Sequence, residues 1–249
     1  MEIKLSDWIK FKDKMSRLSQ KASDELLTWI QKNGGYAAID ADSLINYAYA
    51  LVTKYGEGSA ALSALMYDTM AEVSGASVLP AVVADTATYE EVAKAFNWAK
   101  GISQNEEYIS TFAGKLVKQA GADTTLQNAK RDKSKGAEFA WIPVGDTCAF
   151  CTLLASNGWQ KASADTIKGD HAEHIHANCD CEFMIRFNSD TSVEGYNPDK
   201  YKSELTDAGG RTWNERVNAL RRENYAENKD KINAQKRIAY AKRTELEEN

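Results

Sequence analysis

Apolar residues recur at steps of three and four through the first half of the chain, the spacing that lines one face of an α-helix. The first such segment should run to about Asn33, where Gly34 and Gly35 end it. Its apolar positions are Trp8, Phe11, Met15, Leu18, Ala22 and Leu26. The chain therefore opens with a long amphipathic helix.

The same pattern predicts further helices. One spans Leu44 to Tyr55, between Asp42 as its expected N-cap and Gly56, and the next covers 62–73 before Gly75. After a linker around SVLPAVVADTA, Thr88 and Glu91 have the spacing of a capping box, and two more helices are expected near 105–119 and 123–133. Residues 1–135 are accordingly predicted to form a helical domain.

The pattern changes after residue 135. Phe139, Trp141 and Ile142 indicate a short strand that Pro143 ends, and a second strand is expected from Cys181 to Phe187. These strands place a β-hairpin-containing domain at 136–200.

The last segment, 201–249, is predicted to be a charged helical tail. Thr212 and Glu215 form a second capping-box pattern, and basic and acidic residues alternate beyond it with few apolar positions. Such a helix should project from the body and be ordered by a partner.

All 4 cysteines and all 3 histidines fall between Asp146 and Cys181. Two pairs of thiolates on separate turns suit a tetrahedral zinc ion, and clustered thiols in a reducing compartment more often bind metal than form disulfides. The candidate ligands, of which four are expected to bind, are Cys148, Cys151, His176, Cys179 and Cys181. A closed site of this kind is structural.

Other interpretations of the window are weaker. Unliganded cysteines would be expected among the apolar segments, where none occurs, and a redox CxxC would need a βαβ setting. His171 and Glu173 with the CxxC supply the parts of a zinc deaminase signature, but in the wrong order and without the preceding proline.

Composition narrows the function classes. The 249 residues are 43% hydrophobic, enough for a real core, and no apolar run approaches a membrane span. We expect a soluble protein made in the cytoplasm, without a membrane partner. The net charge of -5 gives no global attraction to nucleic acid.

Three stretches carry a family resemblance: FAWIPVGDTCAFCTLLASNGW, HIHANCDCEFMIRF and VEGYNPDKY. Together, over about 137–201, they resemble the minor capsid, or head morphogenesis, proteins of tailed bacteriophages, the Mu F-like group. TYEEVAKAFNWAKG and TTLQNAKRD resemble the helical region of the same proteins. The five candidate ligands occupy the family's cysteine and histidine positions, and Gly158 occupies its glycine position.

The resemblance implies a low-copy virion protein in contact with the portal protein, the major capsid protein or packaged DNA. We expect no small-molecule substrate and no enzyme, because the chain shows no nucleophile, base and orienter at recognisable spacing. The alternatives are a zinc-containing nucleic-acid-binding module and, less favoured, a zinc-dependent hydrolase or deaminase. The predicted fold class is α+β, mostly α, with a zinc-stapled hairpin domain.

Overall fold

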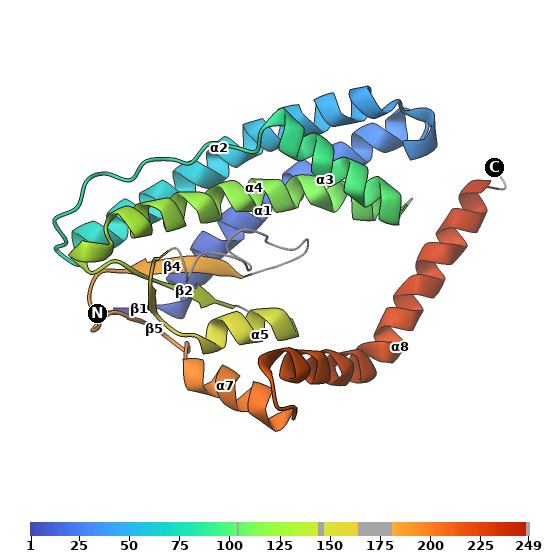
Figure 1. Ribbon diagram of the computed structural model, residues 1–249. Helices are drawn as coiled ribbons and strands as arrows, with labels where there is room; N and C mark the ends of the chain where they lie inside the picture. Colours follow the sequence, from blue (N-terminus) through green and yellow to red (C-terminus); the bar gives the residue numbers. More distant parts are fainter. Residues whose placement is uncertain (104, 144–146, 164–180, 248–249) are drawn as a thin grey trace. The chain divides into compact units, whose positions relative to one another are not determined.

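A computed structural model describes residues 1–103, 105–143, 147–163 and 181–247. The chain forms two compact units that alternate along the sequence: Met1–Asp146 with Gly158–Tyr196, and Thr147–Asn157 with Asn197–Asn249. Helices dominate and the sheets are small, which confirms an α+β class that is mostly α (Figure 1). The zinc staple and the division at 135 and 200 stay predictions.

The bounds of the elements show where each unit takes its helices and strands. The first unit contains β1 (Glu2–Ile3), α1 (Leu5–Lys32), η1 (Tyr36–Ala38), α2 (Ala41–Val73), α3 (Tyr89–Ile102), α4 (Glu106–Arg131), η2 (Lys133–Lys135), β2 (Glu138–Ile142), β3 (Gln160–Lys161), β4 (Glu182–Arg186) and β5 (Ser192–Val193). The second contains α5 (Ala149–Ser156), α7 (Pro198–Asp207) and α8 (Trp213–Glu247).

Helix α1 confirms the first prediction. Its buried side chains include Trp8, Met15, Ala22 and Leu26, and the chain leaves the helix through Gly34 at a φ of 86°. Its start has a cause that no local pattern could show. The backbone N–H of Leu5 donates to the Glu194 carboxylate at 3.0 Å, so the N-terminal cap comes from the far end of the unit.

Helix α2 corrects two predictions. It runs without a break through Gly56, and its N-cap is Asp40, whose carboxylate accepts from the backbone N–H of Ser43 at 2.8 Å. Gly56 serves close packing and not termination, because a Cβ there would lie 2.8 Å from Cγ2 of Thr86. The capping box of Thr88 at the start of α3 is confirmed.

Helix α4 is also continuous, where two helices were expected near 105–119 and 123–133. Glycines inside it let neighbouring helices approach closely. A Cβ on Gly121 would lie 2.5 Å from Cε of Met15 and 2.6 Å from Oγ of Ser59, which belong to α1 and α2. The core between these helices and α3 is apolar, with Leu26, Val52 and the remaining large side chains fully or nearly buried.

The predicted linker between α2 and α3 is an extended strap, residues 76–88, that hydrogen-bonds to α4 (Figure 1). The backbone N–H of Val82 donates to the Asn128 side chain at 2.9 Å, and that of Ala84 donates to Thr124 at 2.9 Å. Arg131 donates to the carbonyls of Leu79 and Pro80. Polar residues of the segment that was expected to form a separate helix, Thr124, Asn128 and Arg131, therefore bind the strap.

The two predicted strands are confirmed and pair with each other. β2 and β4 are antiparallel, with Ala140 opposite Met184, and β3 adds to the other edge of β2. Arg186 of β4 donates to Glu138 of β2 at 2.8 Å and lies over the ring of Trp159. A separate parallel pair joins β1 to β5.

In the second unit, α5, α7 and α8 share a small apolar core of Ala149, Leu205, Val217 and Leu220. The capping box at the start of α8 is confirmed, with Thr212 accepting from the backbone N–H of Glu215. The described helices include none with the length and apolar character needed to cross a membrane.

Candidate functional site

The structure divides the five predicted zinc ligands into three groups. Cys148 and Cys151 belong to the second unit, at the start of α5, and Cys181 belongs to the first unit, immediately before β4. His176 and Cys179 lie outside the described residues, as do His171 and Glu173 of the deaminase alternative. The described residues alone therefore do not test the complete ligand set.

The CxxC pair has a defined local geometry. Cys148 is the N-cap of α5, and its Sγ accepts a hydrogen bond from the backbone N–H of Cys151 at 3.4 Å. The amide and the positive end of the helix dipole both favour negative charge on this sulfur. Cys148 is exposed while Cys151 is buried. Zinc sites often take two of their four ligands from a pair of cysteines at this spacing. The CxxC of this chain could therefore supply two of the thiolates.

Cys181 sits in a different environment. The residue is 3% exposed and immediately precedes β4, the strand that pairs with β2. The next residue, Glu182, is buried and its carboxylate lies 3.9 Å from Nζ of Lys118 on α4. A buried ion pair therefore lies next to the predicted ligand, at the start of β4.

Within the described ranges, no group of three His, Cys, Asp or Glu side chains lies close enough together to hold a metal ion. Only three of the five predicted ligands belong to those ranges, and they are split between the two units. Zinc binding therefore stays a prediction.

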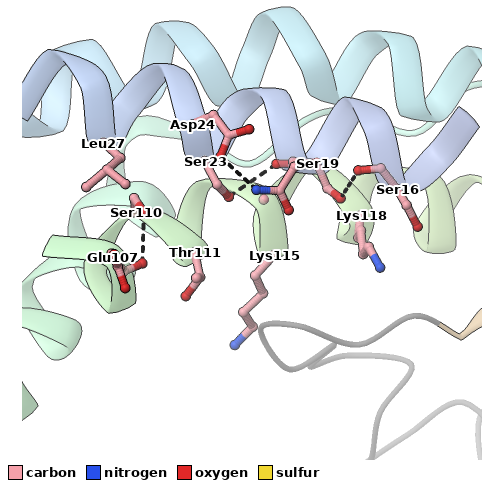
Figure 2. A pocket seen from close by; sticks show the side chains of 12 residues that line it. Ser16, Ser19, Ser23, Asp24, Leu27, Glu107, Ser110, Thr111, Lys115 and Lys118 are labelled. Carbon is pink, nitrogen blue, oxygen red and sulfur yellow. Dashed lines mark hydrogen bonds between the residues drawn. The ribbon is translucent and has the colours of Figure 1, made fainter. Parts of the chain in front are cut away.

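A second candidate site, which the sequence did not predict, is a groove between α1 and α4 with a volume of about 350 Å³ (Figure 2). Five hydroxyl side chains line it: Ser16, Ser19, Ser23, Ser110 and Thr111. The helices are close here because Gly114 of α4 faces Ser19 and Ser23, where a Cβ would lie 2.6–2.7 Å from their atoms.

Charged groups of both signs also line this groove. Lys115 and Lys118 come from α4, with Glu107 two helical turns before Lys115 and Asp24 on α1. Burial lowers the pKa of the Lys115 ammonium, which lies 5.8 Å from the ring centre of Phe112. The Asp24 carboxylate accepts from Gln20 at 2.7 Å.

The groove has no sequence motif, which is why sequence reasoning missed it. Its residues come from two helices about 90 positions apart, and each alone resembles a solvated helix face. The available signal is the serine spacing at positions 16, 19 and 23, which places three small polar residues on one face of α1.

Comparison with known proteins gives one match. A family model described as VG15 protein matches residues 2–208, which is most of the chain. No curated protein and no solved structure matches. The matched range includes the cysteine window and ends before α8.

Proposed function

The chain belongs to the VG15 protein family, a family of phage proteins, and we propose that it is a minor structural protein of the phage head that carries one structural zinc ion. The family match confirms the coarser expectation of a phage protein. We propose in addition that the protein is a minor capsid component, that it belongs to the virion and that it binds zinc.

The observation that carries the proposal is the geometry of the CxxC at the start of α5. Sγ of Cys148 accepts the backbone N–H of Cys151, and both cysteines belong to the first turn of α5. In the proposal, these sulfurs and two of His176, Cys179 and Cys181 hold the zinc. A closed set of four protein ligands leaves no position for water, so the ion would stabilise the fold and carry no reaction.

The proposed partners are the portal protein and the major capsid protein. Support comes from α8, whose described side chains from Arg221 to Asp230 are almost all exposed, with basic and acidic residues interleaved. Mixed charge suits the polar rim of a protein contact, whereas acidic residues among the basic ones would repel the phosphates of packaged DNA. Contact with DNA is therefore the weaker part of the proposal.

Metal analysis of the purified, reduced protein tests the zinc. We expect about one zinc per chain, and Cys148→Ser or Cys151→Ser should release it and lower the melting temperature, because three ligands leave the shell incomplete. His174→Asn is the matched control, since it changes a histidine in the same window that is not a predicted ligand. Wild-type protein with almost no zinc would contradict the proposal.

The virion role needs its own experiment. Mass spectrometry of purified phage particles should find the chain at low copy number, and a phage that lacks the gene should make defective heads. Absence of the chain from mature heads and from procapsids would contradict a structural role, whatever the metal content.

A further inference from the structure

The groove between α1 and α4 contains two ionic groups that no described side chain neutralises. Lys118 is paired with Glu182, and Asp24 is bound by Gln20. By contrast, no salt bridge within the described part of the chain includes Lys115 or Glu107. Lys115 is half-buried, so its ammonium has lost water without gaining an anion.

Four of the five hydroxyl groups that line the groove donate their protons to backbone carbonyls. Ser19 and Ser23 donate to backbone carbonyls of α1 at 2.9 and 3.2 Å, and Ser110 donates to the carbonyl of Glu107 at 2.8 Å. Thr111 does the same on α4 at 2.6 Å. Their oxygens keep free lone pairs, so these walls mainly accept hydrogen bonds. Oγ of Ser16 is buried in the same place without a partner.

The two uncompensated charges are separated along one helix. Glu107 precedes Lys115 by eight residues, which is about 12 Å of rise along the axis of α4. Figure 2 shows Glu107 toward one end of the groove, with Lys118 and Ser16 toward the other and Lys115 between them. An extended peptide covers about 12 Å in roughly four residues. The groove thus has the Glu107 carboxylate near one end and the Lys115 ammonium nearer its middle, at a spacing that a short peptide can match.

We propose that the α1–α4 groove binds a mixed-charge polypeptide segment, with an acidic side chain on Lys115 and a basic side chain on Glu107. A peptide backbone would supply the N–H donors that the serine and threonine oxygens can accept. The inference rests on the proposed function only for its partner, another protein of the phage head.

Nucleic acid fits the groove less well. A phosphodiester chain is uniformly negative and would meet the Glu107 and Asp24 carboxylates, and its phosphates offer no hydrogen-bond donors to the hydroxyl oxygens. Among the described residues that line the groove, Leu27 has the only apolar side chain and none is aromatic, so these residues offer no ring for a base to stack on.

Titration of the full-length protein with capped pentapeptides, followed by NMR, tests the inference. The three peptides have Gly-Ser-Gly in the middle and carry Glu and Lys, two Glu, or two Lys at their ends. The wild type should bind the mixed peptide about fivefold more tightly than either of the others, the increment of one ion pair. The saturable shifts should map to Lys115 and Glu107.

Charge reversal predicts a change of preference that a purely structural role would not produce. Lys115→Glu should favour the peptide with two Lys, and Glu107→Lys should favour the peptide with two Glu. Lys94→Glu on the exposed face of α3 makes the same change in net charge and should keep the wild-type order. If Lys115→Glu does not fold, Lys115→Gln should lose the discrimination between the mixed and the two-Lys peptide.

The inference would be overturned by a lack of saturable binding, by a preference that does not follow the substitutions, or by tighter binding of a (dT)₈ oligonucleotide. Free glutamate and lysine together, binding as tightly as the mixed peptide, would reject the polypeptide as ligand. Peptide binding is measured on the isolated protein, whereas the proposed function is tested by incorporation of the protein into phage heads. A lack of peptide binding would therefore reject this inference without rejecting the proposed function.

Discussion

Helices α4 and α8 are both long and rich in polar residues, yet one is buried and the other is exposed. α4 has 26 residues, and its buried set includes Lys118, Thr124, Thr125 and Asn128. α8 has 35 residues, and in the described part of its second to fifth turns only Val217 and Leu220 are buried. Polarity alone therefore does not decide which helix enters the core.

The difference lies in the size and the partners of the polar side chains. On α4 they are short, bind backbone groups of the strap or, in the case of Lys118, lie beside the Glu182 carboxylate, and glycines such as Gly121 admit the neighbouring helices. On α8 they are long and charged, and a long charged side chain loses more entropy and more hydration on burial. A polar helix can be buried when each polar group gains a specific partner.

The largest expected effect on stability comes from adding a side chain where α4 contacts its neighbouring helices most closely. Gly121→Ala places a Cβ 2.5 Å from Cε of Met15 and 2.6 Å from Oγ of Ser59. We expect the free energy of unfolding to fall by about 1–3 kcal/mol, measured by urea denaturation. Gly101→Ala on α3 is the matched control, because nothing lies within 4 Å of its added Cβ and helix propensity alone should raise stability by up to about 1 kcal/mol. Equal effects at both positions would reject close packing as the reason for Gly121.

A smaller effect is expected where α4 holds the strap. Asn128→Ala removes the acceptor for the Val82 N–H and a donor to the Val82 carbonyl, so we expect a loss of about 1–2 kcal/mol. Faster amide hydrogen exchange at Val82 and Ala84 should accompany it. Gln127→Ala, which removes an exposed bond to the same carbonyl, should cost less than about 0.5 kcal/mol. Unchanged exchange in Asn128→Ala would mean that the strap is held by other contacts.

The smallest effect is expected on α8. Deletion from Tyr225 leaves Val217 and Leu220 in place, so the midpoint of urea unfolding and the zinc content should stay unchanged, with less than about 0.5 kcal/mol lost. The truncated protein should nevertheless fail to enter phage heads. Unfolding of the truncated protein would place the segment in the core, and normal assembly would remove its role as a tether.

The sequence predicted helices and strands wherever the signal was local. Several predictions are confirmed because they depend only on residues close together in the sequence. They are the apolar stripe from Trp8 to Leu26, the capping boxes at Thr88 and Thr212, and the strands β2 and β4. Both errors at helix breaks have one physical reason. Gly56 and Gly121 lie where breaks were expected, but they face the strap and adjacent helices, contacts that only the tertiary structure supplies.

Of the two candidate sites, the cysteine site could be predicted from a local motif and the α1–α4 groove could not. The CxxC is a short motif, and the structure gives it the turn that the spacing predicted, with Cys148 as N-cap. The groove depends on Ser19 and Lys115 meeting across two helices, so periodicity in either helix could not reveal it. His176 and Cys179 lie outside the described residues, and their role rests on the sequence pattern and the family resemblance.

The cap of α1 by Glu194 has a consequence for synthesis on the ribosome. Leu5 and Glu194 are 189 residues apart, and β1 pairs with β5 over the same interval. The residues of α5 are also inserted between two parts of the first unit. This unit can reach its final state only after residue 196 has left the exit tunnel, so α1 and α2 are made well before their last partners. Contacts of such long sequence separation slow folding, so the cap of α1 and the pairing of β1 with β5 must form late, after all residues of the apolar core of α1 to α4 have been made.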